Sequence, residues 1–168
     1  MNQKNLTTKQ IDNIESFRKN IMTFEQQLIA LPTSYGDGKT PGNEEVTKVN
    51  PLNNRFIGGM YIREIFTPKG QVFTTAIHKK DHMYFFMQGE LSILSEDGIK
   101  RLKAPYYGVT RAGTKRIVYV HEDTIWVTVH QTKAKTVDKV IKDVIAKDFN
   151  DPKISIENMR KHLNTKTI

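Results

Sequence analysis

The first regular pattern is a helical stripe of apolar side chains between residues 7 and 31. Its members recur at intervals of three and four, the spacing that places them on one helix face. They are Ile14, Phe17, Ile21, Phe24, Leu28 and Leu31. Thr7 and Gln10 have the spacing of a capping box, and Pro32 ends the helix. The stripe needs a partner, either the rest of this chain or a neighbouring subunit.

From Arg55 the period changes to the alternation of β-strands. Short runs rich in β-branched and aromatic residues are separated by turns such as Pro68-Lys69-Gly70 and Glu96-Asp97-Gly98, the second of which is a hairpin signal. The expected strands are 60–66, 72–78, 82–87, 91–94, 99–103, 107–110, 115–121 and 125–130. We expect the last two to form a hairpin around 122–124. The pattern predicts an all-β sandwich or barrel.

The strand-rich region has an extension on each side. Residues 32–54 are rich in Gly, Pro and Asn and too long for a routine connection, so we expect a loop or extended arm. After Thr132 the helical period returns, with apolar stripes at Val137, Val140, Ile141, Val144 and Ile145 and then at Ile156, Met159 and Leu163. The predicted regions are 1–54, an N-terminal helix and arm; 55–132, the barrel; and 133–168, a C-terminal helical extension.

Composition narrows the range of functions. The chain has 168 residues, a formal net charge of +8 and no cysteine. Disulfides, cysteine-ligated zinc and thiol nucleophiles are therefore excluded. Basic and acidic residues are interleaved, so nucleic-acid binding is not expected. No apolar run is long enough for a membrane span, and residues 1–10 lack the apolar core of a signal peptide, which predicts synthesis in the cytoplasm.

The run GQVFTTAIHKKDHMYFFMQGEL resembles the first motif of the cupin superfamily, in which a glycine turn leads to a His-x-His pair, a Glu and a Gly. By position His78 matches the second histidine, His82 stands at the glutamate and Ala76 replaces the first histidine. The resemblance implies a double-stranded β-helix, the cupin jelly-roll barrel, here with an N-terminal amphipathic helix and C-terminal helices.

The second cupin motif, a Pro-x-Gly turn followed by His, resembles residues 111–116. Gly113 fits, but Arg111 replaces the proline and Arg116 replaces the metal-binding histidine. Two of the four usual ligands therefore match. The wider runs GGMYIREIFTPKGQVFTTAIHKKDH, GELSILSEDGIKRLKAPYYGVTRAGTKR and HEDTIWVTVH look like small cupin-like proteins of bacteriophage genomes, and this resemblance covers about Phe56 to Ile145. It implies a phage setting but no reaction.

The two matched histidines could bind a divalent metal such as Zn, Fe, Mn or Ni. They flank a short turn, and on adjacent antiparallel strands both rings could face the barrel interior. A third ligand would come from His121, His130, Glu64 or Glu90. Strand alternation favours His130, because it shares a face with Trp126 and Thr128, whereas His121 points outward if Arg116 points inward. The alternative is a set of hydrogen-bonded histidines without metal.

A cationic pocket is the second candidate site. Arg116 beside His78, His82 and Tyr107 would suit a carboxylate or phosphate, because a guanidinium can bond two oxygens at once. The alternative is an arginine paired with a surface acid. Trp126 is either part of this ligand site or a core residue with a satisfied N–H. No catalytic residue is assigned from the sequence.

Three functions follow. The first is a non-enzymatic phage protein, a virion or assembly component that acts through homo-oligomeric contacts or other virion proteins, made in the host cytoplasm and possessing no metal. The second is a metal-dependent cupin enzyme acting on a small anionic substrate. The third is a module that binds a small anion. The incomplete metal motif, the long arm and the apolar helix faces favour the first.

Overall fold

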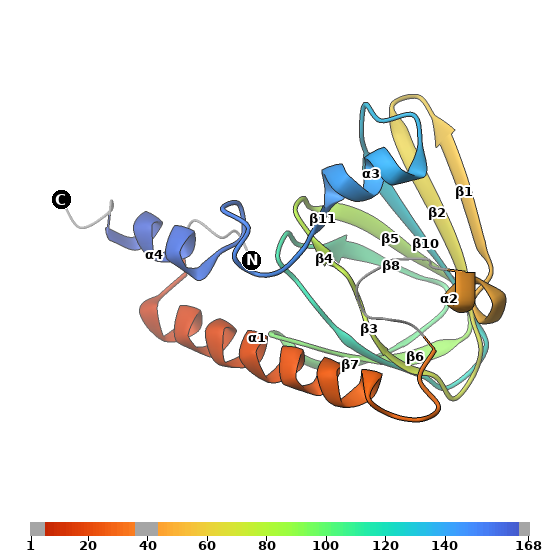
Figure 1. Cartoon of the computed structure of the whole chain (residues 1–168), viewed down its shortest axis with the longest axis horizontal. Helices are drawn as coiled ribbons and strands as arrows, with labels where there is room; N and C mark the ends of the chain where they lie inside the picture. Colours follow the sequence, from red (N-terminus) through yellow and green to blue (C-terminus); the bar gives the residue numbers. More distant parts are fainter. Residues whose placement is uncertain (1–5, 36–43, 165–168) are drawn as a thin grey trace.

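The fold is known from a computed structural model that describes residues 6–35 and 44–164. Two antiparallel sheets face each other, with helices outside them (Figure 1). One sheet has the spatial order β1 (Leu52–Ile57), β2 (Met60–Thr67), β10 (Thr124–Gln131), β5 (His82–Gln88) and β8 (Tyr106–Thr110). The other has the order β3 (Val72–Thr74), β9 (Ile117–Val120), β6 (Glu90–Ser95) and β7 (Gly98–Lys103). A short ladder joins β4 (Ile77–His78) to β11 (Ile145–Ala146). The predicted all-β jelly-roll core is confirmed.

The barrel core follows from strand alternation. In β6 every second residue is buried, beginning with Leu91, and in β9 Val118 and Val120 are fully buried. These side chains meet aromatic residues of the facing sheet in one cluster. The cluster contains Tyr84, Phe86, Leu91, Ile93, Leu102, Val118, Val120 and Trp126. Both sheets therefore share one hydrophobic interior, as the two faces of a closed barrel must.

Two details of the expected strand pattern are wrong. Residues 115–121 and 125–130 do not form a hairpin, because β9 pairs with β3 and β6 whereas β10 pairs with β2 and β5. The turn at 122–124 instead carries the chain from one sheet to the other. The barrel also begins before Arg55, since β1 starts at Leu52 and pairs with β2 along its whole length. The hairpin of β6 and β7 is confirmed.

Helix α1 (Thr8–Ile29) begins at the predicted capping box, in which the Thr7 hydroxyl accepts from the Gln10 backbone N–H. Its buried residues are Ile11, Arg18, Ile21 and Glu25. The helix lies along the chain's own barrel and reaches β3 (Figure 1). The apolar stripe thus has a partner within the chain, although two charged residues occupy central positions of the buried face and Leu31 is half exposed.

Arg18 holds the helix to two separate segments. Its guanidinium donates to the backbone carbonyls of Ile154 (2.6 Å) and Gly113 (3.3 Å) and lies over the ring of Phe149. Gly113 has a φ of 80°, and a Cβ there would lie 2.6 Å from the guanidinium. Both the backbone conformation and this close approach therefore require glycine at the motif position.

Glu25 forms the second anchor. Its carboxylate pairs with the ammonium group of Lys115 at 2.6 Å, and both side chains are more than nine-tenths buried. Lys115 also donates to the carbonyl oxygen of Thr75, and the Thr74 hydroxyl donates to Glu25. All of these partners lie at the end of the barrel beside α1, so the pair fixes the helix against β3.

The remaining helices also pack on the chain itself. Helix α3 (Val137–Val144) buries Val140 and Val144 against Tyr61 of β2. Helix α4 (Ile156–Asn164) joins Met159 to Leu6 and Ile11 of the N-terminal segment. A short helix, α2 (Glu44–Val49), lies in the predicted arm. Residues 36–43 of this arm fall outside the described residues, and so does the side chain of Leu163 in the predicted C-terminal stripe. None of the described helices has the length and apolar character needed to cross a bilayer.

The Glu25–Lys115 pair should be essential to the position of α1. Glu25→Leu leaves a buried ammonium without its partner, so we expect the free energy of unfolding to fall by about 3–5 kcal/mol. The double variant Glu25→Leu/Lys115→Met should recover most of this loss, because it removes both charges. Urea denaturation measures the difference. The exposed variant Glu157→Gln serves as the control, and a similar loss in that variant would contradict the assignment.

Candidate metal centre

Three histidines from three different strands meet inside the barrel. His78 ends β4, His82 begins β5 and His130 lies near the end of β10. The ring centroids are 4.1 Å apart for His78 and His82, 4.3 Å for His82 and His130 and 5.2 Å for His78 and His130. One ring nitrogen of each lies within 4.8 Å of the others. Three imidazoles converging in this way could bind one divalent ion.

The route by which these side chains meet differs from the expected one. His78 and His82 are not on paired strands, because β4 pairs with β11 whereas β5 pairs with β8 and β10. Residue Ile145 of the C-terminal region lies opposite His78 in this ladder. The C-terminal extension therefore helps to fix the first ligand, which the sequence did not indicate.

The third ligand is the one favoured by alternation. His130 shares the inward face of β10 with Trp126 and Thr128, and it is 5% exposed. Of the other candidates, His121 contacts Ser92 outside the barrel and Glu90 pairs with Arg101 on the surface. Glu64 is exposed on β2. These three residues therefore take no part in the cluster.

Burial keeps the three imidazoles neutral. Loss of solvation lowers the pKa of His82 to about 3 and the pKa of His130 to about 4. The pKa of His78 is lowered well below its usual value by burial, with further contributions from the other two histidines, Arg63 and Arg116. The buried Nδ1 of His78 has no hydrogen-bond partner among the described residues. The same is true of the Nδ1 of His82, whereas the Nε2 of His130 bonds to the Thr128 hydroxyl at 3.2 Å. Neutral rings fit a metal ion, which binds the deprotonated ligand.

Two arginines flank the histidines. Arg116 points inward, the first of the two alternatives left open by the sequence, and is 7% exposed. It donates to the Thr110 hydroxyl at 2.9 Å, and its guanidinium lies over the ring of Tyr84. Within the described residues neither Arg63 nor Arg116 forms an ion pair with an acid. Burial lowers the pKa of both side chains. The alternative of a surface Arg116 paired with an acid is therefore wrong.

Arg63 was not identified from the sequence. It lies opposite Thr128 in the ladder of β2 and β10, one inward position away from the pair formed by Tyr61 and His130. The alternation of residues 60–66 places Tyr61, Arg63 and Ile65 on one face, so the same rule that selected His130 would have found it. A charged residue on an inward face was the missed signal.

The other two predicted pocket residues have different outcomes. Tyr107 is 70% exposed and packs beside Phe85 on the outer face of its sheet, so its proposed place beside Arg116 is wrong. Alternation along β8 explains this, since Tyr106 is the neighbour that contacts Tyr84 and Phe86 in the interior. Trp126 belongs to the core cluster, yet its indole N–H has no partner among the described residues.

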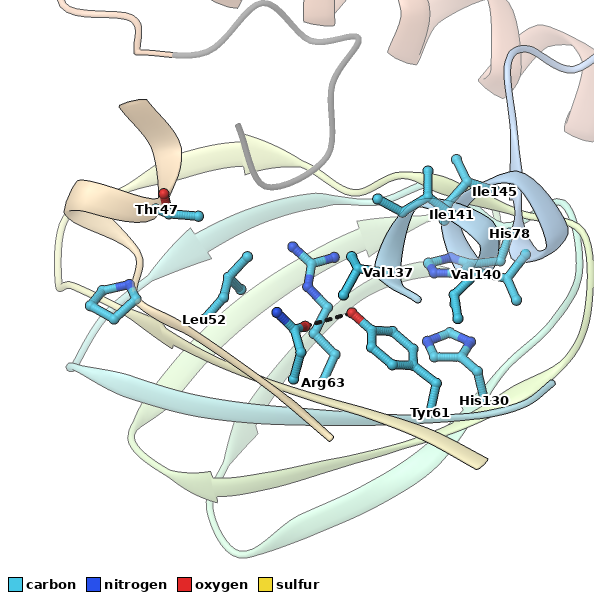
Figure 2. Close-up of a pocket in the computed structure, with 13 residues that line it drawn as sticks. Thr47, Leu52, Tyr61, Arg63, His78, His130, Val137, Val140, Ile141 and Ile145 are labelled. Atoms are coloured by element: carbon cyan, nitrogen blue, oxygen red, sulfur yellow. Dashed lines mark hydrogen bonds between the residues drawn. The ribbon is translucent and has the colours of Figure 1, made fainter. Parts of the chain in front are cut away.

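Two cavities reach the histidines. The smaller, of about 380 Å³, lies between α3 and β2 and is lined by Tyr61, whose hydroxyl donates to Asn54, and by Arg63, His78 and His130 (Figure 2). The larger, of about 940 Å³, contains His78, His82, Arg116 and Trp126 and extends toward α1 and α2. Arg63 and His78 line both. His78 therefore lies between the two cavities, with His130 on the lining of the smaller one and His82 on that of the larger one.

No protein-family model and no curated protein matches the chain. Solved structures that it is similar to include a cupin superfamily protein from Desulfitobacterium hafniense, with 13% identity over 50% of this chain and 78% of that one and a TM-score of 0.43. A conserved protein of unknown function from Streptococcus pyogenes has 16% identity over 62% and 100%, with a TM-score of 0.43. Hydroxypropylphosphonic acid epoxidase from S. wedmorenis has 8% identity over 49% and 50%, with a TM-score of 0.41. At these values the jelly-roll assignment rests on the chain's own strand order.

The metal-free protein should lose stability in mild acid because of these histidines. Below about pH 6.5 the unfolded chain takes up protons on its histidines, whereas His82 and His130 remain neutral in the fold down to about pH 4. In EDTA, the free energy of unfolding should fall by about 2 kcal/mol or more between pH 8 and pH 5. The variant His82→Asn/His130→Asn should show a shallower slope. If the free energy of unfolding falls equally steeply with pH in both proteins, His82 and His130 are not buried in the neutral form.

Proposed function

We propose that this chain is a metal-dependent cupin-like enzyme that acts on a small anionic molecule. The observation that carries the proposal is the convergence of three neutral imidazoles, two buried and one partly buried, beside two guanidinium groups that form no ion pair with an acid among the described residues. Three protein ligands leave coordination positions open, which is typical of a catalytic rather than a structural site. Imidazole ligands suit Zn, Fe, Mn or Ni, and the ligand set does not select among them.

The charge of the site supports an anionic substrate. The three ligands are neutral, so a bound divalent ion would keep its full charge beside the charges of Arg63 and Arg116. The described acids nearest Arg116 in charge interaction are Glu96 and Asp97, neither of which forms an ion pair with it. Such an excess of buried positive charge is stabilised by an anion.

The chain's own residues would bind and orient this anion. Arg116 is held by Thr110 and the ring of Tyr84, so its guanidinium is positioned before a ligand arrives. Arg63 lies across the ladder from Thr128 and would bind from the other side. The hydrophobic core cluster that contains Trp126 would exclude water from the part of the barrel interior next to the site. When bound, the metal would supply Lewis-acid activation of a substrate oxygen or of water.

A second candidate is the non-enzymatic virion or assembly component. It is supported by apolar side chains on the outer face of β5 and β8, where Met87, Tyr107 and Val109 are exposed. Such a surface is suited to contacts between copies of the chain. The completed histidine cluster removes the incomplete metal motif as an argument for this role, so we place it second.

Metal binding tests the first candidate. Purified protein without an affinity tag, dialysed against Zn²⁺ and then freed of excess metal, should retain one ion per chain by elemental analysis. His130→Asn should lower the affinity more than about 100-fold, the upper range for loss of an outer-shell partner. His121→Asn is the matched control, because that imidazole lies outside the barrel, and it should bind metal as the parent does.

Equal loss in both histidine variants, or no retained ion in the parent protein, would contradict the metal centre. If the parent protein retains no ion, two measurements separate the anion-binding module from the virion or assembly component. They are a binding assay with a small anion and native mass spectrometry of the assembly. Anion binding by a metal-free monomer would support the binding module, and a stable oligomer without either ligand would support the virion or assembly role.

A further inference from the structure

The larger cavity has a polar inner end. Arg116 and His82 lie there, each less than one-tenth exposed, together with Trp126. Trp126 and Thr67 are also among the lining residues, and the buried indole N–H of the first and hydroxyl of the second have no hydrogen-bond partner among the described residues. An indole N–H and a guanidinium can only donate. The indole N–H, and the guanidinium beyond its bond to Thr110, therefore need an acceptor at this end, because a buried donor without one is costly.

The outer end of the same cavity is apolar. It is lined by Phe24 and Leu28 of α1, by Val46 and Val49 of α2 and by Phe73 of β3. At the mouth, four large apolar side chains are at least one-third exposed: Leu31, Tyr35, Val49 and Val72. The volume of about 940 Å³ is at the upper end of the range for small-molecule sites. A small inorganic anion would leave most of this surface in contact with water.

We propose that the ligand is an amphiphilic anion, with a carboxylate or related head group at Arg116 and Trp126 and an apolar chain that extends between α1 and α2. This inference rests on the proposed anionic substrate of the metal centre and specifies its chemical class. A short anion fills only the inner end. A neutral lipid fills the outer end but leaves the two guanidinium charges uncompensated. An amphiphilic anion satisfies both ends at once.

The arrangement also gives the two helices a function. The Glu25–Lys115 pair lies on the cavity lining and fixes α1 where Phe24 and Leu28 face the cavity. Both charges of that pair are already satisfied, so Lys115 is not free to bind the anion. The head group is therefore directed past it to the arginines deeper in the barrel.

Calorimetric titration with acetate, octanoate and 1-octanol tests the proposal on the full chain. Each added buried methylene can strengthen binding up to about fourfold, so octanoate should bind at least about 100-fold more tightly than acetate. Octanol has the same chain without the charge and should bind at least about tenfold more weakly than octanoate. Acetate within tenfold of octanoate would overturn the apolar part of the proposal, and octanol equal to octanoate would overturn the anionic part.

Two variants locate the two ends. Arg116→Gln should weaken octanoate about tenfold or more and change octanol little, with Arg63→Gln as a second head-group variant if the first unfolds. Val49→Ser should weaken octanoate and octanol alike by about three- to fourfold. Ile99→Ser is the matched control, since Ile99 is an exposed apolar residue on β7 that does not line the cavity. Equal effects of Val49→Ser and Ile99→Ser would overturn the proposed chain position.

Zinc content is measured on the same preparations, so the two proposals can fail separately. If the protein retains no zinc after dialysis against it but still binds octanoate with the expected variant effects, the ligand class is supported and the metal centre is contradicted. If the protein retains zinc but binds acetate and octanoate equally well, the metal centre is supported and the amphiphilic ligand is contradicted.

Discussion

Strand β10 is paired along both edges, with β2 on one side and β5 on the other, and this double pairing is the constraint on which the interior depends. Its register cannot slip without moving every side chain to the opposite face. Trp126 therefore enters the core, while Thr128 and His130 face the site. The ladder then places Arg63 across from Thr128. The register of β10 therefore fixes both the hydrophobic core and the candidate metal centre.

The sequence predicted the features that depend on local period. Alternation favoured His130, and helical spacing with a capping box predicted α1, whereas the inward position of Arg116 was one of two alternatives that the sequence left open. It could not show which strands are neighbours, because pairing depends on contacts distant in the chain. The hairpin expected at 122–124 was wrong for this reason, whereas the place given to Tyr107 was wrong because alternation along β8 turns that ring outward. Arg63 lies outside both cupin-like motifs, so only the alternation along β2 marks it as an inward residue.

The charged residues inside this molecule fall into two groups. Lys115 is paired with Glu25, and Arg18 bonds to backbone carbonyls; both hold α1 in place. Within the part of the chain that the structure describes, Arg63 and Arg116 form no ion pair with an acid, although desolvation makes their charge costly. A fold that neutralises some buried cations and leaves others uncompensated keeps the latter available for a ligand. This contrast separates the residues that support the barrel from those that would act in it.

The contact between α1 and α4 brings the two ends of the described chain together. Leu6 and Ile11 pack against Met159, and Arg160 pairs with Asp12 and Glu15. Adjoining ends are the geometry that circular permutation requires. A short peptide could join them, and the chain could be opened instead at the Gly58-Gly59 turn between β1 and β2. The order of the elements along the polypeptide is thus separable from their order in space.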